Sequence, residues 1–237
     1  MSAVSVFLLA TLLQSFSVTD SIPHSSDRYL QGLSYTSAGW IESTGGYGKS
    51  KIFKLDFQGN TLDSFALDSR YFGEGSVQLG HEIFWLTWKE GKAFVLDAGT
   101  FRLKDSFFIP TEGWGLTVWN SHLLMSNGSA ELLILDPRSR TVVSTVKVLD
   151  GKNPVKNLNE LEAVGDLLYA NVWLTDSIAV IELPSGRVRA WLDFSEKARA
   201  VRKRNPKAEV LNGIGFDGKN LWITGKNWPE IYKIRFP

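Results

Sequence analysis

The sequence has no cysteine among its 237 residues, which excludes a disulfide framework and a thiolate metal site. Histidine is scarce as well: His24, His81 and His122 lie far apart and form no HxH or HxxxH pair, so a zinc site is not expected. Net charge is equally small, because 26 basic residues against 25 acidic ones leave a formal charge of +1. A chain without excess charge lacks the electrostatic footprint of a nucleic-acid binder, and we expect no nucleic-acid partner.

Long hydrophobic runs are missing too, apart from VSVFLLATLLQSF at Val4 to Phe16. This run has the length of a signal-peptide core, but no Lys or Arg precedes it and no A-x-A cleavage site follows. It is too short for a transmembrane helix, so we expect no membrane association of the mature form. Residues 1–20 are interpreted as a signal peptide or as an N-terminal extension that packs on the domain. A signal peptide would imply secretion, or residence in the periplasm or an endomembrane lumen.

Tryptophan and glycine are abundant, with nine and 21 residues, which is typical of many short strands joined by turns. Alternating apolar strands recur along the chain: KIFKLDFQGN, AFVLDAGTFR, LLILDPRSRT, IAVIELPSGR and IYKIRFP. Their equivalent strand-ending positions are Asp56, Asp97, Asp136, Glu182 and Arg235, at intervals of 41, 39, 46 and 53 residues. Repeats of this length are typical of the blades of a β-propeller. The sequence therefore predicts an all-β fold, a five-bladed β-propeller that forms one catalytic domain over residues 21–237.

The longest departure from the repeat runs from Ala190 to Val210. Its EKARAVRKR core favours a helix, and we interpret it as a short helical insertion between blades four and five, charged because it faces solvent. A basic nucleic-acid patch is the alternative interpretation. A strand within residues 17–28 is expected to close the ring beside the C-terminal blade, since an open propeller would leave a bare strand edge.

Equivalent positions in a propeller lie on one ring around its axis, so the repeat also predicts a site. The position nine residues before each strand end gives a first ring: Tyr47, Trp88, Asn127, Trp173 and Lys226. The glycine-rich inner elements give a second ring: Gln31, Glu74, Trp114, Glu160 and Asn212. The last four residues of the first ring are expected to surround one pocket. Glu74 should lie at the same end, where partial burial would raise its pKa toward a value useful for acid–base chemistry.

Nine stretches, in this order, carry a resemblance to a known family: YLQGLSY, WIESTGGYGKSKI, YFGEG, LTWKEG, GWGLT, MSNGS, NELE, YANVW and VLNGIGFDGKNLWITGKNWPEIYKI. They make the chain, from about His24 to the C-terminus, resemble the glutamine cyclotransferase family, the plant and bacterial type of glutaminyl-peptide cyclotransferase. The resemblance implies a five-bladed propeller that converts the N-terminal glutamine of peptides and proteins to pyroglutamate with release of ammonia. It also implies chemistry without catalytic zinc, unlike the animal cyclases, which have another fold.

Matching the motifs residue by residue implies catalytic roles for Glu74 and Lys226. Glu74 falls on the glutamate of FGEG and is the expected general acid and base, while Lys226 falls on the lysine of TGK and is the expected oxyanion donor. The implied substrate-binding residues are Gln31, Trp88, Trp114, Asn159 and Trp173. Glu160 and Glu162 of NELE compete with Glu74 for the acid–base role.

The chain departs from the family pattern in two places. Tyr29-Leu30 stands where Phe-Thr is usual, which should adjust packing, and Asn127 stands where aspartate is more common. Asn127 also begins a glycosylation sequon, which we expect to stay unmodified because the residue would face the axis. Glu42 matches the family as well, and either bonds backbone amides or binds substrate.

Two other functions stay open at this point. A calcium-dependent propeller hydrolase or lactonase would need several convergent oxygen ligands, for which the second ring offers Glu74, Glu160 and Asn212. A non-catalytic peptide-binding propeller would keep the shape without the chemistry. For the cyclotransferase we expect no cofactor in catalysis, with a structural calcium ion on the axis still open. We expect a monomer that acts on N-terminal glutaminyl peptides or proteins.

Overall fold

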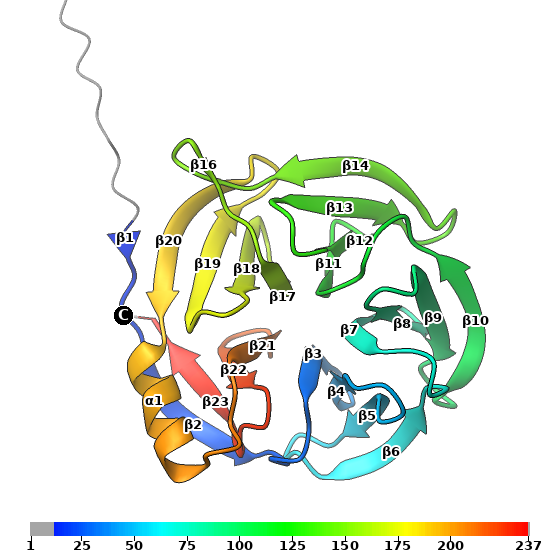
Figure 1. The fold of residues 1–237 in the computed structure, drawn as a ribbon, viewed down its shortest axis with the longest axis horizontal. Helices are drawn as coiled ribbons and strands as arrows, with labels where there is room; N and C mark the ends of the chain where they lie inside the picture. Colours follow the sequence, from blue (N-terminus) through cyan, green and yellow to red (C-terminus); the bar gives the residue numbers. More distant parts are fainter. Residues whose placement is uncertain (1–11, 237) are drawn as a thin grey trace, which may run out of the picture.

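The computed structural model describes residues 12–236, which form five sheets around a common axis (Figure 1). Each sheet is one blade, with its first strand nearest the axis. Blade one contains β3 (Leu30–Thr36), β4 (Gly39–Thr44), β5 (Lys51–Leu55) and β6 (Thr61–Ala66). Blade two contains β7 (Gly73–Leu79), β8 (Glu82–Thr87), β9 (Lys92–Asp97) and β10 (Arg102–Phe108). Blade three contains β11 (Leu116–Trp119), β12 (His122–Met125), β13 (Glu131–Asp136) and β14 (Thr141–Lys147).

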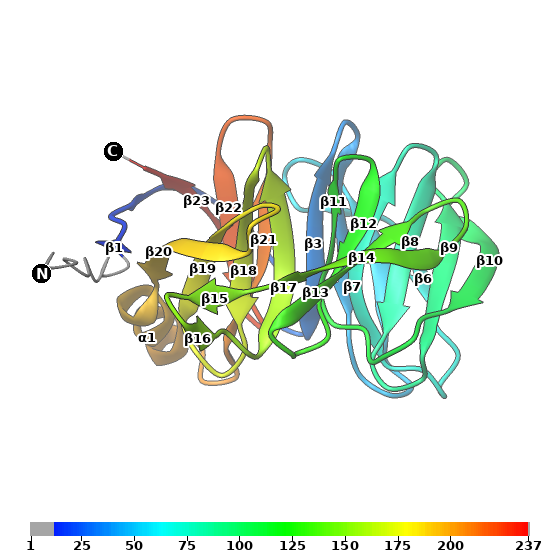
Figure 2. The ribbon, with the colours of Figure 1, turned by 90° about the horizontal axis from the view of Figure 1, so that it is seen from above.

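The last two blades recruit additional segments. Blade four contains β17 (Leu158–Val164), β18 (Leu167–Val172), β19 (Ser177–Glu182) and β20 (Arg187–Asp193). Three two-residue strands extend it: β15 (Leu149–Asp150), β16 (Asn153–Pro154) and β1 (Leu12–Leu13). Blade five contains β21 (Leu211–Phe216), β22 (Leu221–Gly225) and β23 (Glu230–Arg235), with β2 (Ser17–Pro23) as its outer strand. Seen from the edge, the blades form a disc (Figure 2).

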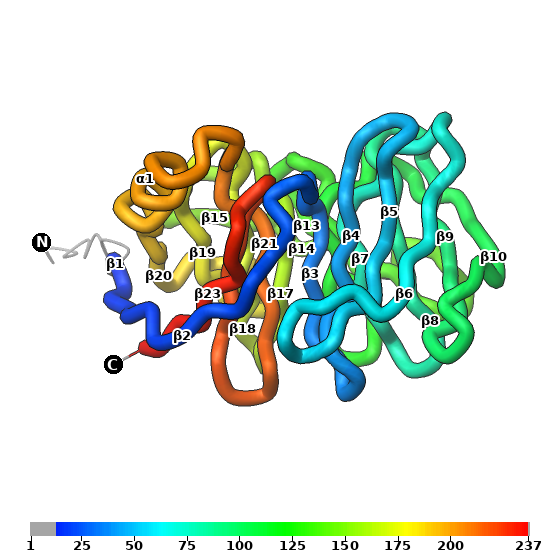
Figure 3. Tube along the Cα trace, turned by 90° about the horizontal axis from the view of Figure 1, so that it is seen from below, coloured from blue at the N-terminus to red at the C-terminus, as the bar shows by residue number. Residues whose placement is uncertain are grey.

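The repeat read from the sequence corresponds to the third strand of every blade. Strands β9, β13, β19 and β23 end at the predicted positions, and β5 ends one residue before Asp56. The all-β, five-bladed prediction is confirmed. So is ring closure from the N-terminal side, because β2 pairs with β23, and the two lie side by side in Figure 3.

The predicted helical insertion is also present, as α1 (Ser195–Arg204) between blades four and five. The departure from the repeat begins after Ala190, since residues 190–193 complete β20, while the helix begins one residue before the EKARAVRKR core. The helix is not only a solvated charged segment: Ala198 and Val201 are fully buried in the core between the two blades. Two of its basic residues are paired within the chain, because Arg202 forms an ion pair with Asp176 and Arg204 forms one with Glu230.

Apolar side chains fill the space between neighbouring blades. Five separate buried clusters occur, one for each pair of adjacent blades, including the pair that joins blade five to blade one. In that closing cluster, Trp40 of blade one meets Trp222 of blade five edge to face, with ring centroids 5.7 Å apart. Strands such as β4 and β8 are therefore buried on both faces, which fixes their register, whereas the outer strands β6, β10 and β14 are largely exposed.

Bulges interrupt the innermost strands where they approach the pocket end of the axis. They occur near the starts of β3, β7, β17 and β21, between residues 30 and 32, 73 and 76, 158 and 161, and 211 and 214. A bulge adds one residue to a strand and redirects the side chains beside it. The backbones of neighbouring blades pack tightly there. A Cβ atom on Gly115, for example, would lie only 1.9 Å from the carbonyl oxygen of Asn159.

The structure bears on two expectations for the N-terminal region and for membrane association. Within residues 12–236, no helix combines the length and the apolar character needed to cross a bilayer. Residues 1–20, interpreted above as a signal peptide or an N-terminal extension, are only partly covered by the structure. Residues 1–11 lie outside the described residues, while residues 17–20 belong to β2 and so to the propeller.

Candidate active site

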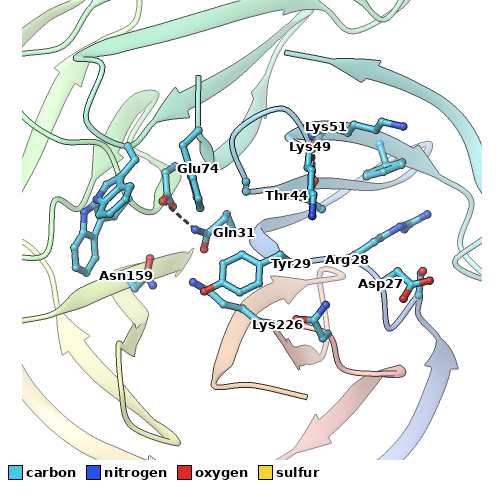
Figure 4. A pocket seen from close by; sticks show the side chains of 18 of the residues that line it. Asp27, Arg28, Tyr29, Gln31, Thr44, Lys49, Lys51, Glu74, Asn159 and Lys226 are labelled. Atoms are coloured by element: carbon cyan, nitrogen blue, oxygen red, sulfur yellow. Dashed lines mark hydrogen bonds between the residues drawn. The ribbon is translucent and has the colours of Figure 1, made fainter. Parts of the chain in front are cut away.

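A cavity of about 1000 Å³ opens at one end of the axis and extends over blade one. All seven residues singled out from the family motifs line it: Gln31, Glu74, Trp88, Trp114, Asn159, Trp173 and Lys226. They come from all five blades, and several lie at or beside the bulges of the inner strands. Figure 4 shows Glu74, Gln31, Asn159 and Lys226 around the central part of this cavity. The roles expected for these side chains stay predictions.

Glu74 is the central carboxylate of the cavity, and its side chain is held in a fixed place. Gln31 donates a hydrogen bond from Nε2 to Glu74 Oε1 at 2.9 Å, while Ser43 and Trp85 donate to the Glu74 backbone oxygen. Burial raises the pKa of Glu74 well above its ordinary value; nearby Lys226 opposes this shift, and Glu112 and Glu90 add to it. A carboxylate whose pKa is raised is a stronger base, which suits it to accept a proton and then return it.

Lys226 is the matching cation, and it is almost completely buried. Burial lowers the pKa of Lys226, against the influence of Glu74 and Glu209. Its Nζ lies 4.5 Å from the centre of the Tyr29 ring, an attractive position for a cation over an aromatic face. The acid and the amine are therefore both shifted toward their neutral forms, a pattern that concentrates at sites of proton transfer.

Three tryptophans form the aromatic walls. Trp114 and Trp173 meet edge to face with ring centroids 5.5 Å apart. Trp88 and Trp114 both donate their indole N–H groups to the same oxygen of Glu112, at 2.9 and 3.1 Å. Glu112 thus fixes the orientation of two walls at once, because it is the shared acceptor.

Asn159 presents an amide group with unused hydrogen-bonding capacity. The residue is buried, yet its side chain makes no hydrogen bond within the described residues, and its Oδ1 has no exposed surface. Buried polar atoms normally have partners, and an exception needs an explanation. Asn159 also lines the cavity, and its Nδ2 group, which has no partner among the described residues, remains a donor for a bound molecule.

The second ring predicted from the repeat contains an error of one residue. The bulge registers align Asn159, not Glu160, with Glu74, Trp114 and Asn212. Glu160 is instead buried between the inner strands and accepts hydrogen bonds from the backbone N–H groups of Leu33 and Ile214, at 3.3 and 2.7 Å. Glu160, Glu162 and Asn212 are not among the residues that line the cavity. Glu74 is therefore the only one of the three candidate acid–base glutamates that lies in the pocket.

The same geometry bears on the calcium alternative. Two backbone N–H groups donate hydrogen bonds to the two oxygens of the Glu160 carboxylate. These oxygens are therefore already bound by donors and are poorly placed to coordinate a cation. Within residues 12–236, no three or more side chains of His, Cys, Asp or Glu gather in a way that could hold a metal ion. The calcium-dependent hydrolase has no observation in its favour here.

The first ring is only partly assembled. Trp88, Trp173 and Lys226 line the cavity, but Asn127 does not, contrary to the prediction. Its side chain caps the turn, accepting a hydrogen bond from the Ser129 N–H at 3.0 Å and donating to Thr111. Tyr47 also lies outside the cavity and is about half exposed, with its hydroxyl donating to Glu90 at 2.9 Å.

Glu42, expected either to bond backbone amides or to bind substrate, forms a different set of contacts. Its fully buried carboxylate accepts a hydrogen bond from Arg28 at 2.7 Å and contacts His24 at 3.1 Å. Burial alone would raise the pKa of Glu42, but His24 and Arg28 outweigh it and hold the pKa below its ordinary value. Glu42 thus anchors the segment between β2 and β3, one wall of the cavity.

Some cavity residues were missed from sequence. Phe72 lies between Tyr47 and Trp88, with ring centroids 5.4 and 5.5 Å away. Tyr29, treated as a packing change, is in the cavity, and burial together with Glu209 raises its pKa to about 12. Glu112 holds two walls of the cavity without lining it, and neither a motif nor a repeat position marks it in the sequence.

The fold and the cavity together define a five-bladed propeller with an axial pocket that is lined by a buried acid, a buried amine and aromatic walls. A family model described as glutamine cyclotransferase matches residues 6–236, and the chain belongs to this family.

Two relatives support this membership. The chain is 33% identical to a glutaminyl-peptide cyclotransferase of Arabidopsis thaliana over 233 residues, 96% of this chain and 73% of the relative. The crystal structure of Myxococcus xanthus glutaminyl cyclase superposes with a TM-score of 0.87 at 29% identity, covering 95% of this chain and 98% of that one.

Proposed function

We propose that this chain is a glutaminyl-peptide cyclotransferase, an acyltransferase that converts the N-terminal glutamine of peptides to pyroglutamate and releases ammonia. The observation that carries the proposal is the buried pair of Glu74 and Lys226 in a tryptophan-walled pocket, in a chain of this family. The proposed active form is a monomer, because one chain supplies each group that the reaction needs.

Binding would place the glutaminyl residue in the central part of the cavity. Trp88, Trp114 and Trp173 would enclose its side chain and exclude water. The negative surroundings of Glu74, to which Glu112 and Glu90 contribute, would attract the α-ammonium group of the substrate. Cyclisation is intramolecular, so the main task of the pocket is to hold the rotamer that brings the α-nitrogen onto the side-chain carbonyl.

The proposed chemistry moves one proton through Glu74. The bound α-ammonium first releases one proton to solvent and becomes the nucleophilic amine. The Glu74 carboxylate then accepts a second proton from this nitrogen as it forms a bond to the carboxamide carbon. Lys226 and Asn159 donate hydrogen bonds to the oxyanion that develops on the carboxamide oxygen. Glu74 then gives the proton to the amide nitrogen, the carbon–nitrogen bond breaks, and ammonia leaves. Gln31 keeps the carboxylate aligned through its 2.9 Å hydrogen bond.

No metal cofactor is part of this proposal, because Lys226 and Asn159 supply the donors that the oxyanion requires. Turnover should then persist after extended dialysis against a chelator, with no loss beyond that of a mock-treated sample. Loss that Ca²⁺ or Zn²⁺ restores would contradict this part of the proposal.

The decisive experiment compares the wild-type protein with Glu74→Gln on a Gln-initiated peptide, following ammonia release and the mass of the cyclised product. Gln has the size of Glu but cannot carry the proton, so turnover should fall roughly 10²–10⁴-fold. Glu131→Gln, which changes an exposed glutamate of β13, is the matched control. Turnover of Glu74→Gln near that of the wild type would exclude this role. If the wild type released no ammonia, the enzyme proposal itself would fail.

A further inference from the structure

The cavity is larger than the glutamine site described above, and its outer part lies over blade one. At about 1000 Å³ it reaches the upper end of the roughly 300–1,000 Å³ typical of small-ligand pockets. Asp27 and Arg28 line one side of the outer part, from the segment before β3. Lys49, from the loop between β4 and β5, and Lys51 of β5 line the other side (Figure 4). We call this outer part the blade-one groove.

Lys49 and Lys51 are the uncommitted charges of the blade-one groove. Both residues are exposed, and among the described residues neither ammonium group forms an ion pair or a hydrogen bond. Arg28 differs, because its guanidinium is bound to the buried Glu42 and lies 4.1 Å from the centre of the Phe53 ring. Asp27 is the one acid that lines the groove, so two free cations face one free carboxylate there.

The charges of the cavity therefore change sign along its length. The central part is negative around Glu74, with Glu112 and Glu90 close enough to affect its pKa, whereas the blade-one groove carries an excess of positive charge. A peptide whose N-terminal residue occupies the central part has its α-ammonium there, and its chain must leave through open space. Each further residue extends at most about 3.3–3.6 Å, so the next few residues pass through a groove of this kind.

We infer that Lys49 and Lys51 form a carboxylate subsite for the residues that follow the N-terminal glutamine. This inference rests on the proposed function and adds a substrate class to it: glutaminyl peptides with an acidic side chain close to the N-terminus. In a dipeptide or tripeptide, the free C-terminal carboxylate would occupy the same subsite. Lys49 and Lys51 thus determine specificity and take no part in the proton transfer at Glu74.

The test measures kcat/KM for Gln-Glu-Ala-amide, Gln-Lys-Ala-amide and Gln-Ala-Ala-amide, and for Gln-Ala with a free or amidated C-terminus. The wild type should prefer the glutamyl peptide over the lysyl peptide, and Lys49→Gln/Lys51→Gln should remove the preference. The expected contribution is up to about five-fold per lysine, since exposed ion pairs are worth roughly 0.2–1 kcal/mol. The preference should weaken in 0.5 M salt, which screens exposed charges. The Gln-Ala pair shows whether a C-terminal carboxylate is also bound.

Lys54→Gln is the matched control, since Lys54 lies on the same strand but does not line the cavity. It should leave the peptide preference as it is in the wild type. A wild type without preference, or a preference that survives the double substitution or disappears equally in Lys54→Gln, would overturn the inference.

The proposed function is tested separately by the neutral peptide Gln-Ala-Ala-amide. Turnover of this peptide without any charge preference would refute only the carboxylate subsite. If no peptide is turned over, the same peptides are titrated onto Glu74→Gln by calorimetry. Tighter binding of the glutamyl peptide, lost in the Lys49→Gln/Lys51→Gln background, would then support the subsite although the cyclotransferase proposal had failed. Equal binding of all peptides would overturn it.

Discussion

Burial changes the proton affinity of Glu74 and Lys226 in opposite directions. It raises the pKa of the carboxyl and lowers the pKa of the amine, so the two values approach each other. The proposed reaction needs the ionised carboxyl, to accept a proton, and the charged amine, to donate to the oxyanion. Both requirements are met only in the pH range between the two pKa values.

A bell-shaped dependence of kcat on pH is therefore expected. Activity should rise as Glu74 loses its proton, at a pH above the ordinary range of a glutamate, and fall as Lys226 loses its proton, at a pH below the ordinary range of a lysine. Lys226→Arg should lower kcat and move the alkaline limb to higher pH, because arginine keeps its charge. The measurement is kcat at saturating peptide across pH 5–10. An alkaline limb that is unchanged in Lys226→Arg would contradict the assignment.

The sequence located most central residues of the pocket but not their partners. Motif matching identified Glu74, Lys226 and the tryptophans, because each lies within a short, distinctive stretch. Repeat counting placed Glu160 where Asn159 lies, since a bulge inserts a residue that periodicity alone does not reveal. The acceptor role of Glu112 depends on two indoles that converge in space, one of them 24 residues away in the chain, and no local pattern encodes it.

At the scale of elements, β17 brings a carboxylate into the centre of the ring. Glu160 of β17 accepts hydrogen bonds from β3 and β21, so one side chain joins blades four, one and five. Burial raises the pKa of Glu160 well above its ordinary value; Glu162 adds to this shift, and the two backbone N–H groups oppose it. The folded protein therefore holds this proton more tightly than the unfolded chain does.

The free energy of unfolding should accordingly depend on pH through Glu160. The stabilising contribution is complete below the ordinary pKa of a glutamate and is lost as pH rises through the raised pKa of the folded state, with a slope of up to about 1.4 kcal/mol per pH unit. Glu160→Gln does not titrate at this position, so its stability should decline less steeply from pH 4 to pH 8. It should be less stable at pH 4 by about 1–3 kcal/mol, because its NH₂ group faces a backbone donor. Urea unfolding at several pH values checks this, with Glu131→Gln as the control. Parallel curves for wild type and Glu160→Gln would contradict it.

Strands and helices long enough to show a periodic pattern were predicted well from the sequence, whereas the two-residue strands were not predicted. The third strand of each blade and α1 have enough residues to show a period of alternation or helical propensity. The two-residue strands β1, β15 and β16 have no period of their own. They arise because blade four offers an edge to pair with, which is a tertiary cause.

At the scale of the whole molecule, the ring is held closed by contacts between the first and last blades. His24 follows β2 and connects both sides, since its Nδ1 contacts the backbone oxygen of Trp228 in blade five and its Nε2 contacts Glu42 in blade one. The pairing of β2 with β23 and the cluster around Trp40 and Trp222 lie beside this connection.

His24→Ala should therefore weaken closure of the ring. Removing it leaves the buried Glu42 with Arg28 as its remaining partner, and loss of a partner for a buried polar group costs about 1–3 kcal/mol. Each kcal/mol corresponds to roughly 2–4 °C of Tm in a chain of this size. Thermal unfolding monitored by circular dichroism measures the shift, and His81→Ala, at an exposed histidine of the turn before β8, is the control. Equal Tm values for the two variants would show that His24 does not secure the closure.

Pairing of β2 with β23 also sets an order of events during biosynthesis. Ser17 pairs with Arg235, so β2 has to wait until the chain has been made as far as β23. At about 5–20 residues per second, the interval is roughly 10–40 s. Blades one to four have their main strands before β23 and can fold on the ribosome, whereas blade five cannot be completed until β23 has left the exit tunnel. During this interval the unpaired β2 exposes a free strand edge to other nascent chains and to chaperones, and its seven residues are the part of the propeller most open to mispairing.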